Sequence, residues 1–80
     1  MPTIALLNSI KIALYFGDHA PSHFHAYYNE YEVVIEIETL AHYRGKFPNK
    51  QYRELMQWAQ ENQEHLRRKW QEFNPLKDNS

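Results

Sequence analysis

Apolar and polar residues alternate along most of the first half of the chain, and this period of two predicts β-strands. The alternating segments are Thr3–Leu7, Ile10–Phe16, His23–Tyr28 and Tyr31–Thr39. Asn8-Ser9 separates the first two segments and suits a tight turn, and Asn29-Glu30 separates the last two. We therefore expect two β-hairpins between residues 3 and 39.

A two-residue turn at Asn29-Glu30 sets the register of the second hairpin. On one face it pairs apolar residues: Phe24 with Ile35, Ala26 with Val33, and Tyr28 with Tyr31. On the other face it pairs His23 with Glu36, His25 with Val34, and Tyr27 with Glu32. A slip of one residue would bury glutamates and expose isoleucines, so the apolar pattern favours this register.

The second half of the chain has helical spacing. Its apolar positions are Tyr52, Leu55, Met56 and Ala59, followed by Leu66, Trp70 and Phe73. A loop through Tyr43–Lys46 leads to Pro48, which suits the first helical residue because it lacks an N–H. Asn62 could cap a second helix, so the pattern fits either one kinked helix or two helices. Asn74-Pro75 ends the helical pattern. The sequence predicts an α+β fold with an antiparallel sheet of four or five strands, helices on one face, and a frayed tail at 76–80.

Length and composition restrict the class of protein. Eighty residues make one domain, and such a small core needs most of its apolar residues for packing. The chain has no cysteine, so a metal ion would depend on histidine, carboxylate or water. There is no basic region before the first apolar run, and no apolar stretch approaches the roughly 20 residues that span a bilayer. We expect a cytoplasmic protein without a membrane segment.

Charge is distributed unevenly along the chain. The net charge is −1, but residues 1–40 hold five acids and one base, whereas residues 41–80 hold five acids and eight bases. Nucleic-acid binding would therefore need a local patch. The candidate phosphate-binding residues are Arg44, Lys46, Lys50 and Arg53, within a stretch that has no acid. The alternative interpretation is a solvated loop and helix start.

The segment Asp18–His25 carries the chemically most distinctive residues. The candidate catalytic residues are Asp18, His19, His23 and His25, because imidazole titrates near neutral pH. His23 and His25 point to the same side of a strand with Glu36 opposite, so these three are a candidate site for a divalent metal. The alternative is that these histidines only make local hydrogen bonds on a polar sheet face. No cofactor follows from the sequence with certainty.

Several motifs together resemble a small bacterial family, domain of unknown function 4160. They are Met1-Pro2-Thr3-Ile4, Asp18-His19-x-Pro21-x-His23-Phe24-His25, Gly45-Lys46-Phe47-Pro48, and the two tryptophans Trp58 and Trp70. The chain departs from the family pattern at Ser22, where the family has a second proline, and near Asn29, where glycine is common. The resemblance implies a small DNA-binding-type partner encoded beside the chain, as in toxin–antitoxin modules.

Three functions follow as hypotheses. The first is an interaction protein of toxin–antitoxin type, using sheet tyrosines as its contact surface: Tyr15, Tyr27, Tyr28 and Tyr31. The second is a small ribonuclease or other phosphoryl-transfer enzyme that uses the histidines and the basic stretch. The third is a metal-binding domain. Whether the chain is an enzyme stays open, as do RNA and a second copy of the chain as partners.

Overall fold

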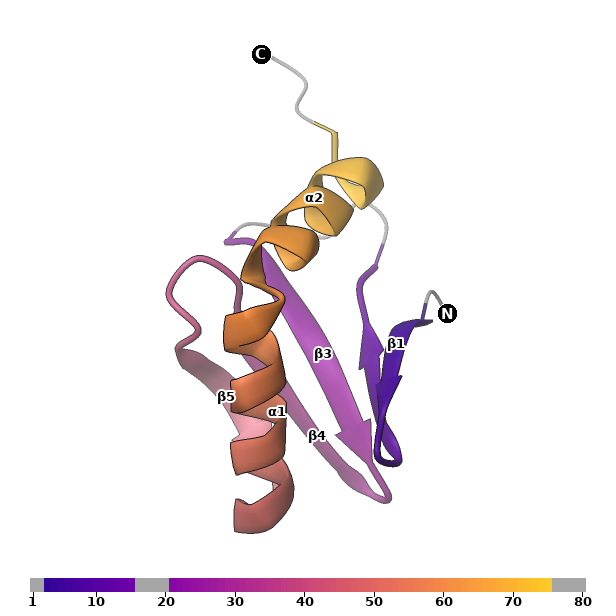
Figure 1. Ribbon diagram of the computed structural model, residues 1–80, viewed down its shortest axis with the longest axis vertical. Coiled ribbons are helices and arrows are strands. Elements are labelled where there is room, and N and C mark those ends of the chain that lie inside the picture. The colour runs from indigo at the N-terminus through magenta and orange to yellow at the C-terminus, as the bar shows by residue number, and fades with distance from the viewer. Residues whose placement is uncertain (1–2, 16–20, 76–80) are drawn as a thin grey trace.

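The computed structural model describes residues 3–15 and 21–75, and in it five strands precede two helices. The strands are β1 (Thr3–Leu7), β2 (Ile10–Ala13), β3 (His23–Tyr28), β4 (Tyr31–Glu36) and β5 (His42–Lys46), and the helices are α1 (Asn49–Glu61) and α2 (Gln63–Phe73). Each strand pairs antiparallel with the next, so the order of strands in the sheet is that of the chain (Figure 1). The predicted α+β fold is confirmed.

Both predicted hairpins form, and three of their four turn residues have the left-handed backbone that is typical of such turns. Asn8 and Ser9 have φ angles of 47° and 71°, as in a type I′ turn, and Asn29 has a φ angle of 53°. The register predicted for the second hairpin is confirmed at all six pairs, from His23 with Glu36 to Tyr28 with Tyr31. The strands are shorter than predicted, since β2 ends at Ala13 and β4 at Glu36. Phe16, the predicted end of the second strand, lies outside the described residues.

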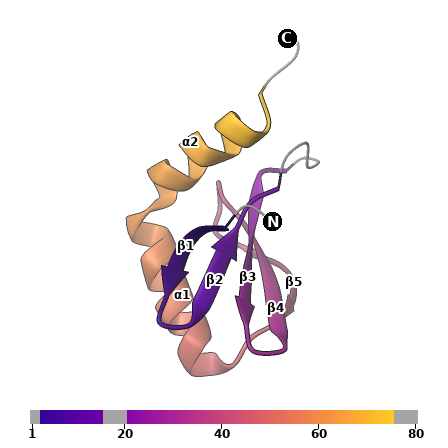
Figure 2. The same cartoon turned by 90° about the vertical axis from the view of Figure 1, so that its right-hand side faces the viewer.

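The two helices cover one side of the sheet (Figure 2). Leu55 and Ala59 from α1 and Leu66 from α2 are completely buried there. The buried residues that they join on the sheet side are Ile10, Ile12, Leu14, Phe24, Ala26, Val33, Ile35 and Ile37. Burying one large aliphatic side chain contributes about 1.5–3 kcal/mol, so this layer is the main source of stability.

Polar contacts attach α2 to the end of the sheet. Gln63 Nε2 donates to the carbonyl oxygens of Ile37 and Glu38, at 2.7 and 3.0 Å. Arg67 Nε donates to both carboxylate oxygens of Glu38, at 3.1 and 2.9 Å, and these bonds raise the pKa of Arg67. The helix therefore has a fixed position where it extends past the strands in Figure 1.

Asn62 divides the helical region into two. Its backbone N–H donates to the carbonyl oxygens of Trp58 and Ala59, and its Nδ2 donates to the Trp58 carbonyl at 2.8 Å. The next helix begins at once, since Leu66 N–H donates to the Asn62 carbonyl at 2.9 Å. The structure thus has two helices, and α2 ends before Asn74 as predicted.

Pro48 lies directly before α1, and the described chain ends two residues after α2. Pro48 precedes α1 as its N-cap, with φ −62° and ψ 146°, so the helix begins one residue later than predicted. The predicted tail at 76–80 lies outside the described residues. Among the helices that the structure describes, none is both long and apolar enough to cross a membrane.

The segment that the sequence predicted as a loop, Tyr43–Lys46, is instead part of β5. It pairs with β4 through Val34 with Arg44, Val33 with Gly45, and Glu32 with Lys46. Gly45 permits this pairing, because it has a φ of +95° and an added Cβ would lie 2.3 Å from the Glu32 carbonyl oxygen. Only glycine adopts such a backbone without strain, so the close approach of β5 to β4 depends on this residue.

We predict that Gly45→Ala destabilises the protein by about 2 kcal/mol or more, from the left-handed backbone and the clash with β4. Urea unfolding followed by circular dichroism measures the effect. Lys46→Ala, at the next and exposed position, is the control and should change the free energy of unfolding by less than about 0.5 kcal/mol. Equal stability of Gly45→Ala and the parent chain would contradict this account of β5.

Candidate functional site

Two residues of the histidine segment, His23 and His25, lie at the start of β3, on the face of the sheet opposite Phe24. His23 and His25 lie there because Phe24 between them is part of the core. The sequence predicted an uncovered face, but His23 is only 3% exposed and His25 only 8% exposed. Aromatic side chains cover the two imidazoles. We call this group the histidine niche; its members are His23, His25, Tyr15, Tyr27, Glu32, Tyr43 and Trp70.

Glu32 is the carboxylate partner of His25. Nδ1 of His25 lies 3.0 Å from Oε2 of Glu32. A carboxylate only accepts, so Nδ1 of His25 carries the hydrogen and Nε2 is the basic nitrogen of the neutral ring. This carboxylate–imidazole pair is the arrangement in which a histidine serves as a general base.

Two tyrosines enclose His25. The Tyr15 ring lies edge-on to the imidazole of His25, with ring centroids 4.6 Å apart, and the Tyr27 ring stacks on that imidazole, with ring centroids 6.3 Å apart. The two tyrosine hydroxyls hydrogen-bond to each other, and the Lys11 ammonium lies over the Tyr27 ring. Burial, the hydrogen bond with Tyr15 and the nearby charge of Glu32 all raise the pKa of Tyr27, so its hydroxyl stays protonated well above neutral pH.

His23 is held by backbone and aromatic contacts. Its Nδ1 donates to the Pro21 carbonyl oxygen at 2.7 Å. Trp70 from α2 and Tyr43 from β5 lie against its ring, with centroid distances of 5.2 and 6.4 Å. The His23 and His25 rings are themselves 5.3 Å apart. His23 therefore joins β3, β5 and α2.

The predicted metal site needs Glu36 beside both histidines. Glu36 is opposite His23 as predicted, and its Oε1 accepts a hydrogen bond from the Thr39 hydroxyl at 2.8 Å. Within residues 3–15 and 21–75, no group of three or more histidine, aspartate and glutamate side chains is arranged to hold a metal ion. A metal site at His23, His25 and Glu36 stays a prediction. Asp18 and His19, the other candidate catalytic residues, lie outside the described residues.

The four candidate phosphate-binding residues divide between two elements. Arg44 and Lys46 are exposed on β5, where the register places them on the same face as Val34 and Glu32. Lys50 and Arg53 are exposed on α1 and belong to a different surface. The structure therefore brings only Arg44 and Lys46 toward the histidine niche.

The β5 strand forms one edge of the sheet, and all five of its residues are exposed. Tyr43 is 48% exposed and presents a large aromatic ring beside two cations. An edge strand offers backbone N–H and C=O groups on its outer side, where another strand can pair. This edge of the sheet is therefore basic, aromatic and exposed along its whole length.

Sequence reasoning missed three members of the niche, namely Glu32, Tyr43 and Trp70. Glu32 lies diagonally across from His25, two residues from the directly opposed Val34. Diagonal neighbours are within reach of long side chains, so the predicted register already contained this signal. Tyr43 was assigned to a loop and Trp70 to the core, and no local pattern indicates that α2 extends as far as His23.

Comparison with known proteins identifies a family by its sequence model. The model described as Domain of unknown function (DUF4160) matches residues 9–71. The matched region includes the histidine segment, β2 to β5, α1 and most of α2. No curated protein and no solved structure matches the chain.

Because the pKa of Tyr27 is raised, we predict that the protein becomes less stable at alkaline pH. An unfolded tyrosine ionises near pH 10, whereas folded Tyr27 ionises only at higher pH. Unfolding above about pH 10 therefore releases a proton, and the free energy of unfolding falls as the pH rises. Tyr27→Phe should remove this contribution and flatten the decline.

Urea unfolding at about pH 9 and pH 11 measures the difference. Tyr31→Phe is the matched control, because Tyr31 is exposed at the end of the same hairpin. An equal decline in Tyr27→Phe and the parent chain would contradict the prediction.

Proposed function

This chain belongs to the family described as Domain of unknown function (DUF4160), and we propose that it acts by binding a small partner protein as one component of a toxin–antitoxin-type module. The observation that carries the proposal is the β5 edge, which is exposed along its whole length. By contrast, the histidines that suggested chemistry are almost fully buried. We place the module in the cytoplasm, because the chain has no cysteine for the disulfides that are typical of small secreted domains.

Strand addition is the binding mode that this edge favours. A segment of the partner pairs its backbone with β5, and the side chains of Tyr43, Arg44 and Lys46 supply contacts. The cations also select the partner. Two copies of β5 side by side would bring like charges together, whereas an acidic segment would be attracted. The partner is therefore a different protein that carries an acidic strand.

The test is complex formation with the small protein that we expect to be encoded beside this chain. The purified proteins, mixed at micromolar concentration, should elute together on size exclusion. The double change Arg44→Glu, Lys46→Glu should weaken association roughly tenfold or more, which corresponds to about 1.4 kcal/mol. Calorimetric titration measures that loss.

The control is Lys50→Glu, Arg53→Glu, which makes the same change of charge at two exposed positions on α1. It should leave the affinity nearly unchanged. Two proteins that elute separately would refute the proposal, and equal losses in both double variants would refute the location at β5.

A second candidate function is phosphoryl transfer on RNA, and the His25–Glu32 pair is the observation that favours it. In this reaction Nε2 of His25 removes the proton from a ribose 2′-hydroxyl, whose oxygen then bonds to the adjacent phosphorus. The bond from phosphorus to the 5′ oxygen breaks, and protonated His23 gives that oxygen a proton. Arg44 and Lys46 hold the phosphate. Burial places this candidate second, because Nε2 of His25 is itself shielded from solvent, and the aromatic side chains of the histidine niche would have to move before RNA could reach it.

Incubation of labelled RNA with the pure protein, with and without a divalent metal, tests this candidate. If it is correct, His25→Gln lowers cleavage by roughly a hundredfold or more through loss of the base. His65→Gln makes the same substitution at an exposed position on α2 and should cleave normally. Intact RNA after incubation with the parent chain would eliminate this function.

A further inference from the structure

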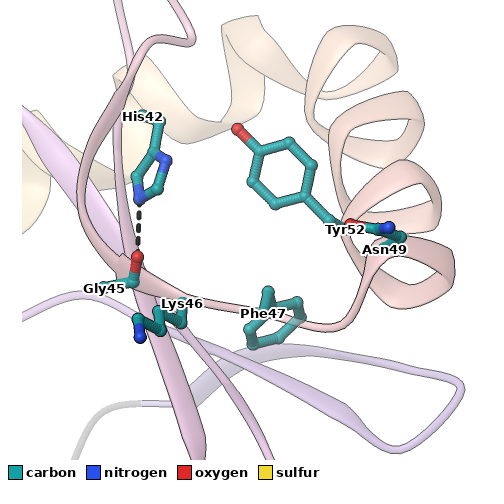
Figure 3. A pocket seen from close by; sticks show the side chains of 6 residues that line it. All are labelled: His42, Gly45, Lys46, Phe47, Asn49 and Tyr52. Carbon is teal, nitrogen blue, oxygen red and sulfur yellow. Dashed lines mark hydrogen bonds between the residues drawn. The ribbon is translucent and has the colours of Figure 1, made fainter.

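A pocket of about 380 Å³ lies between β5 and the start of α1. Figure 3 shows the side chains that surround it, which are His42, Gly45, Lys46, Phe47, Asn49 and Tyr52. Its volume falls within the roughly 300–1,000 Å³ range of small-ligand sites, so one side chain of a partner can enter it. Three of the lining residues have aromatic rings.

The walls of the pocket are fixed by contacts within the chain. Nε2 of His42 donates to the Gly45 carbonyl oxygen at 2.8 Å, as the dashed line in Figure 3 shows. The ring centroids of His42 and Tyr52 are 6.0 Å apart, and those of Phe47 and Tyr28 are 6.2 Å apart. The pocket is therefore preformed, which lowers the entropic cost of binding.

The pairing of β5 with β4 relates the pocket to the cations. Gly45 and His42 pair with Val33 and Ile35, which are core residues, so these two positions belong to the helix side of the sheet. Arg44 pairs with Val34, on the opposite side. Lys46 pairs with Glu32, also on the opposite side, and contributes to the pocket lining as well. A strand added along β5 would direct alternate side chains to the two sides. One set would reach the pocket, and the other set would reach the cations.

We propose that this pocket binds an aromatic side chain of the partner strand that adds to β5, with acidic residues immediately before and after it. The inference rests on the proposed partner-binding function and specifies the chemistry of the partner. Aromatic rings favour edge-to-face and offset contacts with other rings, which His42, Phe47 and Tyr52 supply. The Asn49 amide at the rim can bond a phenol hydroxyl, which favours tyrosine.

Two blocked peptides test the inference directly. One has the sequence Glu-Val-Glu-Tyr-Glu-Val-Glu, and in the other alanine replaces the tyrosine. Fluorescence anisotropy of labelled peptides should show the tyrosine peptide binding roughly tenfold more tightly, since a buried aromatic contact is worth more than about 1.4 kcal/mol.

Two variants test whether the difference in affinity between the peptides comes from the pocket. Asn49→Trp places a large side chain at the rim and should abolish the preference for the tyrosine peptide. Lys50→Trp, at the next and exposed position of α1, should retain it. Arg44→Glu, at a position outside the pocket lining, should weaken the binding of both peptides, because it replaces a cation that attracts the glutamates of both.

The outcomes separate this inference from the function on which it rests. Equal affinity for the two peptides would overturn the pocket assignment, whereas a complex that still forms with the whole partner would leave the proposed function in place. A chain that forms a dimer at micromolar concentration and then excludes both peptides would assign the edge to a second copy. Such a dimer would overturn the inference as well.

Discussion

The register between β3 and β4 determines nearly everything else in this fold. The left-handed Asn29 makes the turn short, and the alternation of apolar residues then leaves one acceptable pairing. That pairing places Phe24 and Ile35 under the helices and His25 near Glu32 on the other side. The core and the histidine niche are thus two faces of one hairpin. A change in the turn would disturb both together.

Because His23 and His25 are buried, loss of their hydrogen bonds would lower the free energy of unfolding. A buried imidazole without partners would destabilise the chain by roughly 1–3 kcal/mol. Pro21 and Glu32 accept from the two Nδ1 atoms, while Trp70 and Tyr43 cover His23. The cluster thereby ties α2 and β5 to the middle of the sheet. A residue pattern that suggests catalysis can equally serve to position an exposed edge.

The sequence predicted those parts of the structure that depend on local patterns. Alternation and turn residues are local, and they led to both hairpins and to the correct pairing of His23 with Glu36. The β5 strand was missed because Arg44, Gly45 and Lys46 resemble a loop in isolation. Their extended conformation comes from pairing with β4, and pairing is a long-range property. The burial of His23 was missed for the same reason, since Trp70 is far from it in the chain.

The charges of β5 explain how an open edge can be tolerated. Exposed strand edges promote aggregation unless charge or a bulge protects them, and β5 has both, because its pairing shifts between Val34 and Ile35. Protection by cations is selective, since it repels another basic strand but attracts an acidic one. The residues that keep the chain from pairing with itself are therefore the ones that specify its partner.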